Sequence, residues 1–140
     1  MTGAPVFDGL GDQMAYNMNK LTEKAQEAIA AGQRQAEDRR NTQLEPEHIL
    51  HALVCQENGV VPSVLEKLDV NLRSVRTELE SAVAGFAQST TPAQLSISPR
   101  FRQMFEGATS EAARLKDDYI STEHFLLADR KSTRLNSSHV

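Results

Sequence analysis

The feature that most constrains this chain is an internal duplication. Residues 44–50, Leu-Glu-Pro-Glu-His-Ile-Leu, return as Ile-Ser-Thr-Glu-His-Phe-Leu at residues 120–126, an offset of 76 positions (44 to 120). The match continues upstream without a gap and pairs, for example, Ile29 with Phe105. A match of this length at one register favours a duplicated structural unit over two helical hairpins that are similar by chance. We therefore expect two copies of one unit.

Apolar residues that recur at three-to-four spacing predict four helices in the first copy. The Thr22 hydroxyl can cap the first helix, and Pro46 suits the first position of the second, where a missing N–H costs nothing. Asn58-Gly59 is a stop signal. The expected helices begin near residues 22, 46, 60 and 72, and the first and last end near Arg39 and Phe86.

The second copy repeats only the first two of these helices. Ser98-Pro99 is a strong helix start, and a second start is expected at Ser121. The first of these helices has an apolar stripe made of Phe101, Met104, Phe105, Ala108, Ala112 and Leu115. No stretch reads as a strand. The predicted fold class is therefore all-α, with tandem duplicated four-helix repeats of which the second is truncated.

The pattern also divides the chain into parts. Asp129-Arg130 stand where the offset would place the apolar pair Leu53-Val54, and the residues that follow are polar without a helical stripe. We interpret this end as a tail foreign to the repeat, with a genuine flexible C-terminus as the alternative. The expected parts are a disordered leader or mis-assigned start at 1–17, the first repeat at 18–86, a linker at 87–96, the incomplete second repeat at 97–128 and the tail at 129–140.

Charge and composition exclude several classes of function. The net charge of −4 comes from interspersed acids and bases, so no basic face for nucleic acid is expected. The sequence has no apolar run of the roughly 20 residues that span a bilayer and no signal peptide, which predicts no membrane partner and a cytoplasmic location. The single cysteine, Cys55, is expected to be a small buried hydrophobe, with a catalytic thiol as the sharper alternative.

No catalytic or metal constellation is expected. The glycines are scattered and none forms a phosphate-binding loop, so this fragment is not expected to be an enzyme or to bind a nucleotide cofactor. His48 and His51 lie three residues apart, but spacing supplies no third metal ligand. We expect His48 and His124 to take part in polar packing near helix starts. Glu47 is interpreted as a first-turn acid that opposes the helix dipole.

The two repeats resemble the Clp N-terminal (Clp R) domain. The resemblance is carried by residues 18–29, by the Leu-Glu-Pro-Glu-His stretch and by its second copy, and it covers residues 18–128. The form of that stretch and the Val60-Val61-Pro62 segment look more like ClpB, the bacterial disaggregase branch, than like the protease-partner Clp ATPases.

The resemblance implies an all-helical domain that binds substrate ahead of two AAA+ ATPase modules. The full-length parent would be a homohexamer that uses ATP and magnesium, together with an Hsp70 system, to thread unfolded or aggregated proteins in protein disaggregation and the heat-stress response. An adaptor-docking domain of a protease-linked Clp ATPase is the alternative, and a stand-alone Clp-repeat protein is a third possibility.

The resemblance also implies substrate-binding positions. Those that match Thr22, Asp117 and Glu123 are associated with substrate handling in the family, although each also has a plain structural role as a cap, loop or first-turn residue. Phe105 is added from the residues themselves, because the first helix of the second repeat carries bulkier apolar side chains than that of the first. A groove between the repeats that exposed part of this volume would suit unfolded segments that are both hydrophobic and basic.

Overall fold

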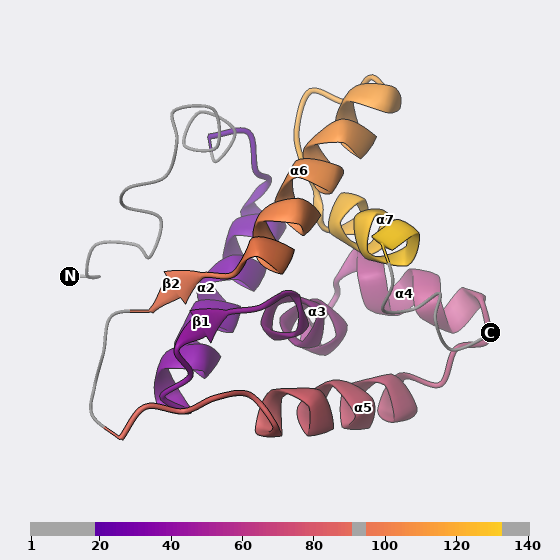
Figure 1. Cartoon of the computed structure of the whole chain (residues 1–140). Helices are drawn as coiled ribbons and strands as arrows, with labels where there is room; N and C mark the ends of the chain where they lie inside the picture. Colours follow the sequence, from indigo (N-terminus) through magenta and orange to yellow (C-terminus); the bar gives the residue numbers. More distant parts are fainter. Residues whose placement is uncertain (1–18, 91–94, 133–140) are drawn as a thin grey trace.

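The computed structural model describes residues 19–90 and 95–132 (Figure 1). The expected leader at 1–17 and the expected tail from residue 133 onward lie outside the described residues. The helices are α2 (Glu23–Asp38), α3 (Pro46–Cys55), α4 (Val60–Lys67), α5 (Leu72–Ala84), α6 (Pro99–Arg114) and α7 (Thr122–Ser132), and the strands are β1 (Gln43–Leu44) and β2 (Ser96–Ile97). The all-α fold class is confirmed, since each strand is only two residues long.

The helices begin and end close to where the start and stop signals predict. The Thr22 hydroxyl accepts a hydrogen bond from the Ala25 N–H at 3.2 Å, and Pro46 occupies the first turn of α3. Helix α5 ends at Ala84, two residues before the expected Phe86. Local capping chemistry therefore sets most of the helix boundaries.

The two short strands correct the expectation that the chain has no strand. β1 and β2 pair in parallel, with Gln43 opposite Ser96 and Leu44 opposite Ile97, and the Ser98 N–H donates to the Leu44 carbonyl at 3.2 Å. Two residues are too few to show the alternation of apolar and polar side chains by which a strand is recognised in a sequence. The pairing joins the segment before α3 to the segment before α6.

A second parallel contact repeats this pairing with the two repeats exchanged. Leu21 pairs with Ile120 in an isolated bridge, the Thr22 N–H donates to the Ile120 carbonyl at 3.0 Å, and the Ile120 N–H donates to the Lys20 carbonyl at 2.7 Å. The 76-residue offset converts the Leu21–Ile120 pair into the Leu44–Ile97 pair with the partners reversed. The segment that opens each repeat therefore pairs with the middle of the other repeat.

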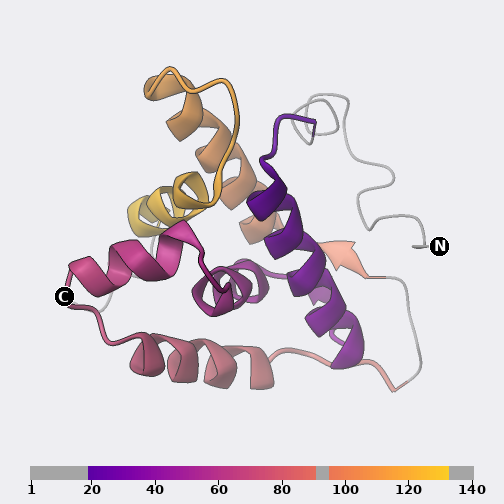
Figure 2. The same cartoon turned by 180° about the vertical axis from the view of Figure 1, so that it is seen from behind.

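The helices pack around α3. Helix α3 lies between α2 and α5, α6 packs against α7, and α4 reaches from the first repeat to α7 of the second (Figures 1 and 2). Eight of the ten residues of α3 are buried, more than its apolar face alone would account for, because Glu47 and His48 are buried as well. The core is therefore shared between the repeats rather than built separately in each.

Glu47 has a larger role than the helix-dipole effect expected for it. Its side chain is fully buried, and both carboxylate oxygens accept hydrogen bonds from Arg100 of α6, at 2.7 and 3.2 Å. Arg100 also lies 3.3 Å from Glu45, and Asp129 acts on it electrostatically. The hydrogen bonds that Arg100 donates to Glu47 are the main reason that the pKa of Arg100 is raised. This ion pair links the two repeats.

His48 organises the turn before α3, as its position near a helix start predicts. Its Nδ1 accepts the Glu45 N–H at 2.9 Å, so its Nε2–H donates to Asn41 Oδ1, also at 2.9 Å. The imidazole is fully buried and its edge meets the Phe86 ring at 5.4 Å. Burial lowers the pKa of His48 to about 4, although the charge of Glu47 acts in the opposite direction.

This lowered pKa predicts acid sensitivity. Between pH 4 and 6.5 the unfolded chain binds a proton at His48 that the folded chain does not, so the free energy of unfolding falls as the pH is lowered through this window. The loss levels off below pH 4 and amounts to roughly 3 kcal/mol at most. Urea denaturation at a series of pH values measures it. A His48→Gln variant should lose this part of the slope, and an unchanged slope in the variant would contradict the assignment.

The cross-repeat ion pair predicts that Arg100→Met destabilises the fold. The substitution keeps the alkyl stem but removes the guanidinium that faces a buried carboxylate, which should cost roughly 2–4 kcal/mol in the free energy of unfolding. Lys24→Met is the matched control, because Lys24 occupies the corresponding position of the first repeat and its ion pair with Glu27, at 3.7 Å, is exposed. That control should cost less than about 1 kcal/mol. Equal losses of unfolding free energy in the two variants would show that the buried Arg100–Glu47 pair stabilises the fold no more than an exposed ion pair does.

Candidate functional site

The turn between α6 and α7 brings the sequence-predicted polar residues together. Two residues after the end of α6, Lys116 adopts the left-handed conformation at φ 61°, and the Asp117 N–H donates back to the Ala112 carbonyl at 2.8 Å. The first repeat ends α2 in the same way, with Arg40 at φ 56° and the Asn41 N–H donating to the Ala36 carbonyl. After this turn the chain runs beside the start of α2 before α7 begins (Figure 2).

Asp117 is held by the second copy of the histidine turn. Its Oδ2 lies 2.9 Å from His124 Nε2, while the Ser121 N–H donates to His124 Nδ1 at 2.8 Å. His124 is buried, which confirms its expected part in polar packing. In the first repeat the place of Asp117 is taken by Asn41, which is 5% exposed, whereas half of the Asp117 side chain is exposed. The second copy therefore presents a carboxylate to solvent where the first buries an amide.

Thr22 is joined to the α6–α7 turn through the backbone of Ile120. Thr22 caps α2 with its hydroxyl and pairs with Ile120 through its N–H, and Ile120 lies three residues beyond Asp117. Thr22 is half-buried. Its structural role as a cap is thus shown, and its role in substrate binding stays a prediction.

Glu123 corresponds to Glu47, but it lacks the cross-repeat partner that Glu47 has. Glu123 is half-buried and, among the described residues, accepts only the Thr122 hydroxyl, at 3.5 Å. By the repeat offset Lys24 should face it as Arg100 faces Glu47. Lys24 instead reaches Glu27 at 3.7 Å and the Glu57 carbonyl at 3.4 Å. The carboxylate of Glu123 therefore keeps its capacity to bind a cation.

Phe105 lies apart from these residues, in the core. It is 1% exposed, and its ring packs edge-on against Phe125 and at a tilt against Phe101, with ring centroids 5.8 and 6.2 Å apart. The expected groove that would expose part of this apolar volume is absent from the described part of the chain, because Phe125 of α7 covers it. In this conformation the Phe105 ring offers no surface to a polypeptide.

Two exposed apolar residues in the same turn were not anticipated. Leu115, assigned by its spacing to the apolar stripe of α6, is 46% exposed, and Tyr119 is 60% exposed. The repeat offset could have indicated this exposure, since it aligns Leu115 with the polar Arg39 and Tyr119 with the polar Gln43. We use the name α6–α7 surface for the set Thr22, Leu115, Asp117, Tyr119 and Glu123.

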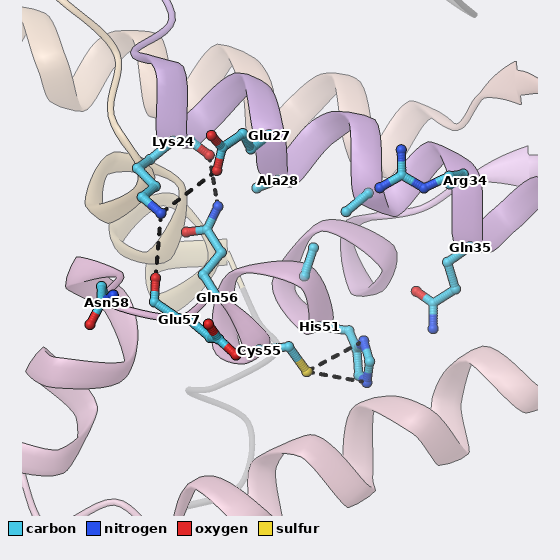
Figure 3. Close-up of a pocket in the computed structure, with 12 residues that line it drawn as sticks. Lys24, Glu27, Ala28, Arg34, Gln35, His51, Cys55, Gln56, Glu57 and Asn58 are labelled. Carbon is cyan, nitrogen blue, oxygen red and sulfur yellow. Dashed lines mark hydrogen bonds and ion pairs between the residues drawn. The ribbon is translucent and has the colours of Figure 1, made fainter.

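A separate groove lies between α2 and α3 (Figure 3). Its volume is about 730 Å³, and the Gln56 side chain crosses it to donate to the Lys24 carbonyl at 2.9 Å. In the second repeat α6 and α7 also approach closely, since a Cβ added at Gly107 would lie 3.0 Å from that of Ala128. The groove is lined by Lys24, Glu27, Ala28, Ala31, Arg34, Gln35, His51, Ala52, Cys55, Gln56, Glu57 and Asn58.

Cys55 in this groove is exposed, which corrects the expectation that it is buried. The apolar neighbours Leu53 and Val54 point to the core, but Cys55 falls on the opposite side of α3. Its sulfur lies 3.8 Å from His51 Nε2, and His51 in turn lies 3.0 Å from Glu80 of α5. Desolvation raises the pKa of the Cys55 thiol, which opposes formation of the nucleophilic thiolate.

The described residues contain no cluster of three His, Cys, Asp or Glu side chains arranged to hold a metal ion. None of the helices in residues 19–90 and 95–132 is both long and apolar enough to cross a membrane.

The chain is similar to known proteins along most of its length. It is 42% identical over 109 residues to the chaperone protein ClpB of Bdellovibrio bacteriovorus, which covers 77% of this chain and 13% of that protein. It is 33% identical over 128 residues to the ClpB of Rhodopirellula baltica, which covers 89% of this chain and 14% of that protein. The chain thus spans about one seventh of the length of these relatives.

Solved structures have the same fold. The N-terminal domain of the ClpV1 ATPase from E. coli superposes with a TM-score of 0.80 at 16% identity, covering 86% of this chain and 74% of that one. The N-terminal domain of Hsp104 from Candida albicans gives 0.71 at 20% identity, covering 78% and 72%. Residues 20–138 match the Clp repeat (R) N-terminal domain. The chain therefore belongs to the Clp repeat (R) N-terminal domain family.

Proposed function

We propose that this chain is the N-terminal substrate-binding domain of a ClpB-like, ATP-dependent protein disaggregase, and that its α6–α7 surface binds unfolded or aggregated polypeptides. The relatives named ClpB support the choice of this branch. In this proposal the parent protein is cytoplasmic, carries ATP-hydrolysing modules that use magnesium, assembles as a homohexamer and works with an Hsp70 system in protein refolding after heat stress.

The observation that carries the proposal is the combination of charge and exposure on the α6–α7 surface. Asp117 and Glu123 present carboxylates without a lysine or arginine partner among the described residues, and Leu115 and Tyr119 expose apolar area beside Asp117. Such a surface complements segments that carry both basic and apolar side chains. Native proteins bury most large apolar side chains, so segments of this kind are accessible chiefly in unfolded chains.

Docking of a specific partner is the second candidate function. A ClpV N-domain solved in complex with a VipB peptide has the same fold, with a TM-score of 0.75 at 16% identity. That complex concerns another protein and a defined peptide. For this chain, partner docking would require tight, sequence-dependent binding, whereas substrate binding by the α6–α7 surface should be weak and tolerant of sequence.

The charge part of the proposal predicts that Asp117→Asn combined with Glu123→Gln weakens binding of an unfolded, basic model protein. Asn at position 117 reproduces the Asn41 arrangement of the first repeat, so the bond to the buried histidine is retained while the charge is removed. We expect a loss of about three- to tenfold in affinity, since each exposed charge pair contributes up to about 1 kcal/mol. Chemical-shift titration with a reduced, unfolded protein measures it.

Glu66→Gln is the matched control for this experiment, because Glu66 is an exposed glutamate on α4, away from the α6–α7 surface. It should leave the affinity unchanged. The folded, disulfide-intact form of the same model protein should cause little chemical-shift change. Equal binding of the folded and unfolded forms, or an unaffected double variant, would count against the proposal.

The apolar part of the proposal predicts that Tyr119→Ser weakens binding of the unfolded model protein without destabilising the fold. Tyr119 is 60% exposed, so its replacement should change the free energy of unfolding by less than about 0.5 kcal/mol. Leu68→Ser is the control, because Leu68 is also 60% exposed but lies at the end of α4. If the two variants lost the same affinity, binding would depend on general hydrophobicity rather than on this surface.

A further inference from the structure

The connection between α3 and α4 contains the dipeptide Asn58-Gly59, whose backbone geometry explains its sequence. Asn58 is exposed and has a φ of 58°, in the left-handed region that asparagine and glycine adopt at low cost. A Cβ added at Gly59 would lie 3.0 Å from the Gln56 Cβ and 3.3 Å from the Pro62 Cδ, so a larger residue fits poorly there. The turn therefore favours an asparagine followed by a glycine.

An Asn-Gly dipeptide is chemically labile when no hydrogen bond restrains the asparagine side chain or the glycine N–H. Within the described part of the chain, neither the Asn58 side chain nor the Gly59 N–H makes a hydrogen bond. The close-up of the groove shows Asn58 on its rim without any marked contact (Figure 3). Rotation about the Cα–C bond of Asn58, which brings the Gly59 nitrogen to the side-chain carbonyl carbon, therefore breaks no hydrogen bond of these two groups.

Two other asparagines lack this freedom. The Asn41 amide is buried, donates to the Ala87 carbonyl at 3.3 Å and bonds to His48. Asn71 is exposed, but its Oδ1 accepts the Ser74 N–H at 3.1 Å as the cap of α5, and the bulkier Leu72 follows it. These residues provide comparisons inside the same molecule.

We propose that Asn58 is a site of spontaneous deamidation, a modification that introduces aspartate or isoaspartate between α3 and α4. The Gly59 nitrogen attacks the Asn58 side-chain carbonyl carbon, forming a five-membered succinimide, and the side-chain nitrogen leaves as ammonia. Water then opens the ring at either carbonyl. One water enters and one ammonia leaves, and no electrons are transferred.

The products have different physical effects. An aspartate keeps the backbone and adds a carboxylate on the rim that Lys24 also lines, next to the Glu57 carbonyl that Lys24 reaches. An isoaspartate adds a methylene group to the backbone itself, directly before α4. Because α4 packs against α3, α5 and α7, the longer backbone loosens a contact between the repeats.

Peptide mapping tests the site. The purified protein is incubated at physiological temperature and mildly alkaline pH, digested with trypsin and analysed by mass spectrometry, with fragment ions used to locate a gain of about one dalton. We expect Asn58 to deamidate at least about tenfold faster than Asn71 in the folded protein. Asn41, in the same tryptic peptide as Asn58, should not react. Equal rates at Asn58 and Asn71 would overturn the proposal.

An Asn58→Gly variant provides the control for folding and for assignment. Glycine accepts the left-handed conformation, so the variant should fold and its peptide should show no mass gain. A mass gain of the same size in this variant would place the reaction elsewhere and refute the assignment. An Asn58→Asp variant should melt like the unmodified protein, whereas the isolated isoaspartate form should melt at a lower temperature.

Discussion

The structure depends on a reciprocal pairing of backbone between its two repeats. The segment before α2 pairs with the segment before α7 through Leu21 and Ile120, and the segment before α6 pairs with the segment before α3 through Ile97 and Leu44. A hydrogen-bonded backbone contact fixes both distance and register, which side-chain packing alone leaves looser. The pairing therefore sets which residues of one repeat face those of the other. It also places the start of α2 beside the α6–α7 turn, so the candidate site is built from both repeats.

The two repeats share a backbone but differ in how their charges are compensated. Arg100 meets the buried Glu47 with two hydrogen bonds, a geometry that the planar guanidinium fork supports and an ammonium does not. Lys24, at the corresponding position, contacts residues of its own repeat and makes no ion pair with Glu123. One member of the duplicated pair thus joins the repeats through a buried ion pair, while the other keeps a carboxylate without a lysine or arginine partner among the described residues. Duplication makes this division possible, because only one copy of the contact is needed to join the repeats.

Much of the fold could be predicted from the sequence, because helix caps and apolar spacing are local signals. Thr22, Pro46 and Ser98 begin their helices where capping chemistry requires. The strands could not be predicted, since their partners lie far apart in the chain and each is too short for a pattern. The site was predictable only in part, because the exposure of an apolar residue depends on which helices cover it. Phe105 is covered by α7, whereas Leu115 lies just past the end of α6 and is 46% exposed.

The alignment of the two copies helps to predict which residues are exposed. A position that is apolar in both copies, such as Ile49 and Phe125, lies in the core of both. A position that is apolar in one copy and polar in the other must tolerate both, and Tyr119, aligned with Gln43, lies at the surface accordingly. Asp129 is an exception, because it aligns with the buried Leu53 and is itself only 3% exposed. Arg100 contributes to this burial, because the guanidinium that pairs with Glu47 also interacts electrostatically with Asp129, which offsets part of the cost of burying a second carboxylate. A difference in polarity between the copies therefore accompanies exposure at Tyr119 but not at Asp129, where a compensating charge is present.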